Sequence, residues 1–194
     1  MLSEINAQLF EDCTAMRHTL DDPTVFAQRD QLHYVICDGI SCGTTLLELL
    51  ASLAILYRPC LFLFLYTGHG QRPGQLVFQH EPKQVRAVQL APLLCALRAK
   101  ATLVMLDCCY STSVFSYIHF PGLVVVPACG HDQTTTTGFT TKVLVPILRG
   151  ACGASQNAEC QRYQAECRSQ GCIRLFRLIE HIRVHLSVGW LMAG

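Results

Sequence analysis

The chain has few charged residues and no excess of either sign. Only 15% of its 194 residues are charged, and 15 lysines and arginines almost balance 14 aspartates and glutamates. Such a balance gives no excess of positive charge that would bind nucleic acid, so we expect no nucleic-acid partner. Apolar residues make up 51% of the chain, which argues against extended disorder.

The sequence also lacks an uninterrupted hydrophobic run that could cross a membrane. Its longest apolar stretch, residues 46–65, is broken by Glu48, Arg58 and Pro59, whereas a spanning helix needs about 20 consecutive apolar residues. The first residues show no basic segment followed by an apolar one, so we expect no secretory signal and no membrane partner. The 12 cysteines then indicate free thiols in a reducing compartment, which predicts a cytoplasmic protein.

No internal repeat or long linker divides the chain, and its length suits one domain. Apolar runs closed by glycine or polar residues predict strands at 31–38, 60–66, 102–107 and 122–127, and a hairpin at 76–78 and 85–88. Apolar residues at helical spacing predict helices at 5–20, 44–57, 90–100, 140–148 and 172–186. Strands that alternate with helices indicate an α/β protein with a mainly parallel sheet flanked by helices.

A histidine and a cysteine each follow one of the predicted buried strands. His69 has a glycine on either side and comes after the strand 60–66, and Cys109 comes after the strand 102–107. The carboxyl ends of parallel strands form the edge where open α/β sheets bind their ligands. An imidazole beside a thiol makes a base and a nucleophile. The pair therefore predicts a cysteine peptidase.

The residues around both positions resemble the motifs of a known family. The run 66–70, Tyr-Thr-Gly-His-Gly, resembles the Tyr-Ser-Gly-His-Gly motif of metacaspases and other caspase-like cysteine peptidases. The run 107–111, Asp-Cys-Cys-Tyr-Ser, resembles their Asp-x-Cys-x-Ser motif. Cys109 follows His69 by 40 residues, close to the roughly 50 that separate these residues in caspases. The resemblance covers about residues 5–150.

The chain departs from the family pattern at several points. Tyr110 and Thr112 stand where the family usually has histidine and glycine. The chain begins too close to its first predicted helix to contain the family's hydrophobic first strand, so we expect that strand to be missing. The acidic cluster that makes many metacaspases calcium-dependent is not seen, and we expect no metal and no cofactor.

The resemblance implies a three-layer caspase-like fold over residues 1–194. In this division, residues 1–130 form a large-subunit-like region that holds the dyad, and residues 131–194 form a small-subunit-like region. The family's activity would be endopeptidase cleavage of proteins or peptides, in regulated cell death, stress or defence. Self-cleavage within residues 150–171 is a further expectation, because the polar sequence there contains or borders three arginines, Arg149, Arg162 and Arg168.

The resemblance also implies a role for each site residue. Cys109 would be the nucleophile and His69 the general acid and base, with the N–H groups of Gly70 and Cys109 as the oxyanion hole. Asp107 would line the pocket for an arginine or lysine of the substrate, since a carboxylate binds a guanidinium through charge-assisted hydrogen bonds and disfavours acidic groups. Asp107 could instead pair with a structural arginine. Cys108 is expected to be a buried packing residue, because neighbours on a strand point to opposite faces.

Two other functions remain open. A non-catalytic caspase-fold scaffold or regulator would bind a partner chain, or a second copy as a homodimer, through an exposed sheet edge. A different thiol peptidase of the same clan would share the dyad and differ in its pocket. We do not expect a zinc site at Cys167, Cys172, His181 and His185, because the gap between the two pairs is too short for a zinc finger. His131 and Asp132 are expected to lie in a solvated loop.

Overall fold

The computed structural model describes residues 2–22, 42–59, 61–80, 84–116, 118–130 and 140–149, together with Arg162 and Ala165. The chain divides into two compact units, which are described separately below. One unit is Met1–Ile36 with Gly138–Gly194, and the other is Cys37–Thr137. The predicted strand 31–38 and helix 172–186 lie outside the described residues, and the assignment of residues 1–194 to one peptidase domain stays a prediction.

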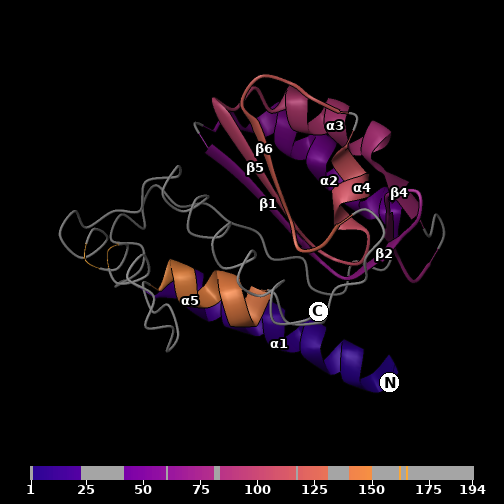
Figure 1. The fold of residues 1–194 in the computed structure, drawn as a ribbon. Coiled ribbons are helices and arrows are strands. Elements are labelled where there is room, and N and C mark those ends of the chain that lie inside the picture. The colour runs from indigo at the N-terminus through magenta and orange to yellow at the C-terminus, as the bar shows by residue number, and fades with distance from the viewer. Residues whose placement is uncertain are drawn as a thin grey trace. The chain divides into compact units, whose positions relative to one another are not determined.

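A three-stranded parallel sheet forms the centre of the second unit (Figure 1). Its strands, in spatial order, are β1 (Leu61–Thr67), β5 (Ala101–Asp107) and β6 (Leu123–Pro127). The predicted strands 60–66, 102–107 and 122–127 are therefore confirmed to within a residue. Every residue of β5 after Ala101 is buried, as expected for a central strand that has a neighbour on each side and reads as an unbroken apolar run.

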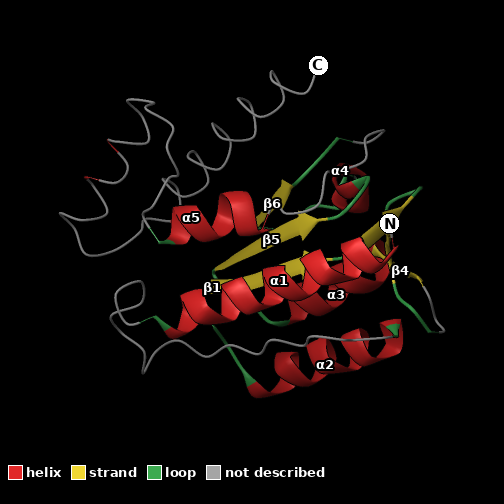
Figure 2. Ribbon diagram, turned by 90° about the horizontal axis from the view of Figure 1, so that it is seen from below, coloured by secondary structure: helices red, strands yellow, loops and turns green. Residues whose placement is uncertain are grey.

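Two helices cover one face of this sheet, as Figures 1 and 2 show, and they confirm the predicted helices 44–57 and 90–100. They are α2 (Gly43–Leu56) and α3 (Ala87–Ala96). Side chains at alternate positions of the strands pack against these helices. The largest fully buried members of this core are Leu50, Leu76, Leu90, Leu94, Leu97 and Leu106. Each fully buried leucine of this kind contributes about 1.5–3 kcal/mol of hydrophobic stabilisation.

A second, antiparallel sheet follows β1 and carries His69. Its strands are β2 (His69–Gln71), β3 (Gln75–Val77) and β4 (Gln84–Arg86). The predicted hairpin is confirmed in β3 and β4, whereas β2 is a strand that the sequence pattern did not predict. Three residues show no periodicity, and β2 exists because His69 pairs with Val77 and Gln71 pairs with Gln75.

Helix α3 begins three residues before the predicted start at residue 90. Arg86 ends β4 and is also the residue that caps α3, and its backbone N–H donates a hydrogen bond of 2.9 Å to Oε1 of Gln89. A side chain that accepts from the cap residue satisfies one of the backbone donors left unpaired at a helix start. The strand therefore runs directly into the helix.

The first unit consists of helices in its described part. They are α1 (Leu2–Asp21), the π-helical turn η2 (Thr140–Leu144) and α5 (Val145–Leu148). The predicted helices 5–20 and 140–148 are thus confirmed as helical. Buried Asp12 of α1 accepts a hydrogen bond from Gln8 Nε2 at 3.3 Å, within the same helix, and one from the backbone N–H of Thr141 at 3.1 Å, which joins α1 to η2.

None of the helices that the structure describes is long and apolar enough to cross a membrane.

Candidate active site

The two motifs lie at the same edge of the parallel sheet. Strand β1 pairs with β5 in a register that sets Thr67 opposite Asp107. The backbone N–H of Gly68 continues this pairing, because it donates a hydrogen bond of 3.1 Å to the carbonyl oxygen of Asp107. His69 and Cys109 are each two residues beyond the last paired position. The carboxyl ends of β1 and β5, after which the sequence predicts the two site residues, therefore lie side by side.

A backbone contact then joins the segment after β1 to the segment after β5. A Cβ atom on Gly70 would lie 2.0 Å from the carbonyl oxygen of Cys109 and 3.1 Å from Sγ of Cys108. No side chain fits in that space, and glycine permits this close approach of two backbones. The residue after His69 is thus packed directly against Cys109.

The structure brings the backbones of the predicted dyad together but does not join the two side chains by a hydrogen bond. His69 is exposed and Cys109 is half-buried, and among the residues that the structure describes no hydrogen bond joins the imidazole to the thiol. Because successive side chains on a strand point to opposite faces, the imidazole projects away from the face on which Gly70 meets Cys109. Catalytic hydrogen bonds in ligand-free enzymes are often long and tighten only when substrate binds.

Tyr66 holds the backbone of His69 in place. Its hydroxyl group is shared between the carbonyl oxygens of His69, at 2.9 Å, and Val77, at 3.0 Å, and its ring packs edge-on against Phe78 with 6.0 Å between centroids. Burial raises the pKa of the Tyr66 phenol well above its ordinary value, which keeps the hydroxyl protonated as a donor. Tyr66 belongs to the motif at 66–70, but the sequence alone assigned it no role.

The loop that carries Cys109 is anchored on its other side to the end of β6. Ser111 is fully buried, accepts a hydrogen bond from the backbone N–H of Cys129 at 3.0 Å, and donates one to the carbonyl oxygen of Cys129 at 3.1 Å. The backbone N–H of Thr112 also donates to that oxygen, at 3.2 Å. These bonds begin the short helix α4 (Ser111–Phe115), which the sequence pattern did not predict.

Cys108 and Asp107 are both buried. Cys108 is completely buried within the core cluster, which confirms the predicted packing role, and burial raises the pKa of its thiol far above the ordinary value. A thiol that stays protonated is a poor nucleophile, so of the two adjacent cysteines Cys109 is the one suited to react. Asp107 ends β5 with 4% of its surface exposed, and its role in substrate binding stays a prediction.

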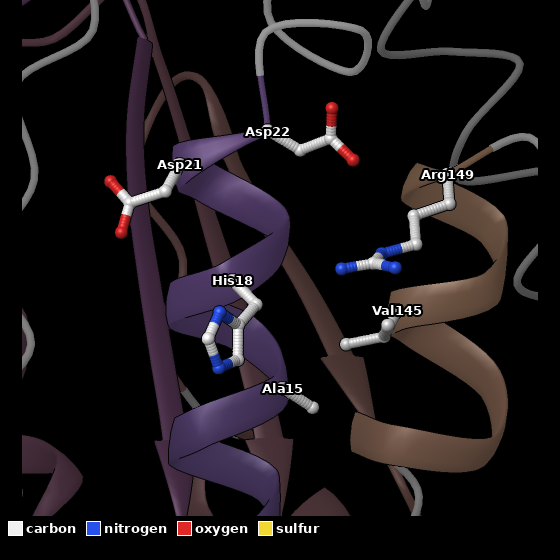
Figure 3. A pocket seen from close by; sticks show the side chains of 6 residues that line it. All are labelled: Ala15, His18, Asp21, Asp22, Val145 and Arg149. Atoms are coloured by element: carbon white, nitrogen blue, oxygen red, sulfur yellow. The ribbon is translucent and has the colours of Figure 1, made fainter.

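Two pockets lie away from this edge. One of about 640 Å³ is bounded by α1 and the C-terminal end of α5, where Arg149 extends toward α1 (Figure 3); its lining residues are Ala15, His18, Asp21, Asp22, Val145 and Arg149. The other, of about 490 Å³, lies between the ends of α2 and α3. Neither pocket includes His69 or Cys109.

The described part of the chain contains no group of three or more histidine, cysteine, aspartate or glutamate side chains that could hold a metal ion. The cysteines and histidines of the zinc-like pattern at 167–185, and the predicted loop residues His131 and Asp132, lie outside the described residues.

Comparison of the chain with protein-family models, with curated proteins and with solved structures finds no match. The resemblance to caspase-like peptidases therefore rests on the two motifs themselves.

Proposed function

We propose that this protein is a caspase-like cysteine endopeptidase with Cys109 as nucleophile and His69 as general acid and base. The observation that carries the proposal is the register of β1 on β5. It pairs Thr67 with Asp107, so that His69 and Cys109 each lie two residues beyond the last pair. The packing of Gly70 on Cys109 supports it, because it brings the histidine-bearing backbone against the cysteine-bearing backbone.

The chemistry follows from these two groups. His69 accepts the proton of the Cys109 thiol, and the resulting thiolate attacks the carbonyl carbon of the scissile peptide bond. The protonated imidazole then gives its proton to the leaving amine, which frees the first product and leaves an acyl group on Cys109. A water molecule, activated by His69, hydrolyses this thioester and restores the thiol. In this mechanism the N–H groups of Gly70 and Cys109 stabilise the negatively charged oxygen.

Asp107 is the residue that we propose to select the substrate. It lies at the end of β5, two residues before the nucleophile, and it is almost fully buried. A carboxylate in such surroundings interacts more strongly with a guanidinium or ammonium group than an exposed one does, and it repels an acidic side chain. We therefore propose cleavage after arginine or lysine.

Self-processing, if it occurs, is not expected after Arg149. Its backbone N–H donates to the carbonyl oxygen of Val145 at 3.0 Å, so this residue ends α5 in a helical hydrogen bond. Its Nε donates to Oγ1 of buried Thr19 at 3.0 Å. An arginine held in this way cannot enter a substrate pocket unless α5 first unwinds. We therefore propose self-cleavage at Arg162 or Arg168, within the polar segment. Arg162 also lies in a helix, so cleavage there would require that helix to unwind.

Several finer features belong to the same proposal. A three-layer caspase-like arrangement, a cytoplasmic location and a role in regulated cell death, stress or defence are all what the resemblance of the two motifs implies. A partner chain or a second copy at the sheet edge also stays a proposal. It is the expected mode of action if the protein proves to be a scaffold rather than an enzyme.

The proposal can be tested with fluorogenic peptides that carry arginine, lysine or aspartate before the scissile bond. The wild-type protein is expected to cleave the two basic peptides, and Cys109→Ala and His69→Ala are expected to lose this activity. Cys95→Ala is the matched control, because Cys95 is an exposed thiol on α3 and its loss should leave cleavage unchanged.

Three outcomes would contradict the proposal. Cleavage that persists in Cys109→Ala would assign the activity to another residue or to a contaminant. Faster turnover of the aspartate peptide would remove the role of Asp107. A folded wild-type protein that cleaves no peptide and is not labelled at Cys109 by an arginine chloromethyl ketone would favour the non-catalytic scaffold.

A further inference from the structure

The β2–β3 hairpin contacts the loop that carries Cys109, and the helix α4 that follows it, at several points. At the start of the hairpin, Gly70 lies against the carbonyl oxygen of Cys109. At its turn, a Cβ atom on Gly74 would lie 2.3 Å from the carbonyl oxygen of Ser113, so this glycine also packs directly on the opposite backbone. Both contacts depend on the absence of a side chain.

A side-chain contact lies between these two backbone contacts. The guanidinium carbon of Arg72 is 5.0 Å from the centre of the Tyr110 ring. A cation at this distance from an aromatic face is attracted by the electron density of the ring, and arginine in addition stacks on it. Arg72 belongs to the turn after β2, and Tyr110 directly follows Cys109. The pair therefore spans the two segments that bear the proposed dyad.

The backbone of Tyr110 shows that its position is determined by its surroundings. Its φ of 56° and ψ of 25° lie in the left-handed region, which a bulky residue enters only at a cost. Strained conformations of this kind persist where neighbouring contacts fix them. The bonds of Ser111 and Thr112 to Cys129 fix the chain after Tyr110, and the contact with Arg72 holds its ring.

We propose that Arg72 and Tyr110 form a clamp that aligns the His69 hairpin with the Cys109 loop. Both are positioning residues, since they act through His69 and Cys109 rather than on the substrate, and this inference rests on the proposed function. Loosening the clamp lowers the fraction of molecules in which the imidazole reaches the thiol. An exposed contact of this type changes such a fraction by about two- to five-fold.

Four single variants distinguish an effect of the clamp on alignment from an effect on folding. Arg72→Gln removes the charge, and Arg72→Lys keeps it without the planar group. Tyr110→Phe keeps the ring, whereas Tyr110→Asn removes it and places in the left-handed region a residue that tolerates that conformation. Tyr110→Asn is therefore expected to fold at least as stably as the wild-type protein, which urea unfolding can verify.

Two readouts distinguish alignment from general stability. The first is the separation of kcat from KM on the arginine peptide. The second is the rate at which iodoacetamide alkylates Cys109 as a function of pH, followed by mass spectrometry with fragment spectra that distinguish Cys109 from Cys108. A thiol paired with an imidazole reacts at lower pH than an ordinary thiol. His69→Ala gives the profile of the unpaired thiol.

Arg72→Gln and Tyr110→Asn are each expected to lower kcat about two- to five-fold with little change in KM, and to move the alkylation profile toward that of His69→Ala. Tyr110→Phe should match the wild-type protein and Arg72→Lys should fall between. The double variant Arg72→Gln/Tyr110→Asn should lose less than the sum of the two single effects, because the contact between Arg72 and Tyr110 is lost only once.

The outcomes also separate this inference from the proposed function. If wild type and His69→Ala show the same alkylation profile, no dyad exists, and the proposed function and the clamp are both overturned. If those two profiles differ but Arg72→Gln and Tyr110→Asn keep the wild-type profile and kcat, the dyad stands and the clamp is wrong. Effects of the two variants that simply add would also overturn the clamp, since they would then act independently.

Discussion

Replacement of Gly70 by alanine should impair catalysis even in the molecules that remain folded, in addition to destabilising the fold. The new Cβ atom would lie 2.0 Å from the carbonyl oxygen of Cys109, whereas real Cβ atoms essentially never come within 3.0 Å of another heavy atom. Cys109 or the hairpin must therefore move by at least about 1 Å, a misplacement that costs about 100-fold in rate in an aligned active site. This corresponds to about 2.7 kcal/mol of lost transition-state stabilisation. The overpacking itself should cost about 1–3 kcal/mol of folding stability.

The amino end of the parallel sheet offers a matched control. A Cβ atom on Gly122 would lie 2.6 Å from the carbonyl oxygen of Lys100, and the φ of Gly122 is +81°, so Gly122→Ala also forces a backbone displacement. Lys100 precedes β5 and Gly122 precedes β6, which places this collision at the amino end of the sheet, away from Cys109. Gly122→Ala should lose about 1–3 kcal/mol of stability and keep the wild-type kcat/KM.

Urea unfolding gives the stability of each variant. Its activity is the kcat/KM on the arginine peptide, measured at a urea concentration well below the unfolding midpoint. The expected pattern is a similar loss of stability in the two variants and a loss of activity in Gly70→Ala alone. A folded Gly70→Ala protein with wild-type kcat/KM would refute the reasoning, because the contact of Gly70 with Cys109 would then not determine the alignment of the site. An equal loss of activity in Gly122→Ala would refute it too.

Two further predictions concern Tyr66 and Cys108. Tyr66→Phe keeps the ring contact with Phe78 but removes the hydroxyl that holds the His69 carbonyl. It should cost about 1 kcal/mol of folding stability and lower kcat more than it changes KM. An unchanged kcat in steady-state assays would exclude this positioning role. Because burial keeps the Cys108 thiol protonated in the folded state while the unfolded thiol ionises above about pH 8.5, the free energy of unfolding should fall with rising pH by about 1.4 kcal/mol per pH unit. Burial raises the pKa of Tyr66 as well, which should steepen the fall above about pH 10. Urea unfolding at a series of pH values should show this fall in the free energy of unfolding in wild type and in Cys95→Ala. Below about pH 10, Cys108→Ala should not show it. Equal slopes in all three proteins would contradict the assignment to Cys108.

The central strands could be predicted because a strand that is buried on both faces appears in the sequence as a continuous apolar run. Strand β5 is buried on both faces, and the run 101–106 is correspondingly apolar except for Thr102. Two parallel strands that end in polar motifs also place those motifs at one edge of the sheet. The position of the candidate site, though not the contacts within it, therefore follows from sequence alone.

The parts that escaped prediction are short, and tertiary contacts determine their conformation. Strand β2 has three residues and forms because it pairs with β3. Helix α4 has five residues and begins where Ser111 and Thr112 bond to Cys129. Neither has a length at which periodicity could be recognised. Tyr66 likewise looks like the last apolar residue of a strand until its hydroxyl is placed between two carbonyl oxygens.

The two members of the proposed dyad are not held equally firmly. Cys109 is fixed from one side by the bonds of Ser111 and Thr112 to Cys129 and from the other by Gly70. Contacts fix only the backbone of His69, which pairs with Val77 and is held by Tyr66, while its side chain is exposed. In the proposed mechanism, the exposed imidazole would have to rotate toward Cys109 to complete the site. A peptide lying across this edge would favour that rotation by excluding water from around the imidazole and the thiol.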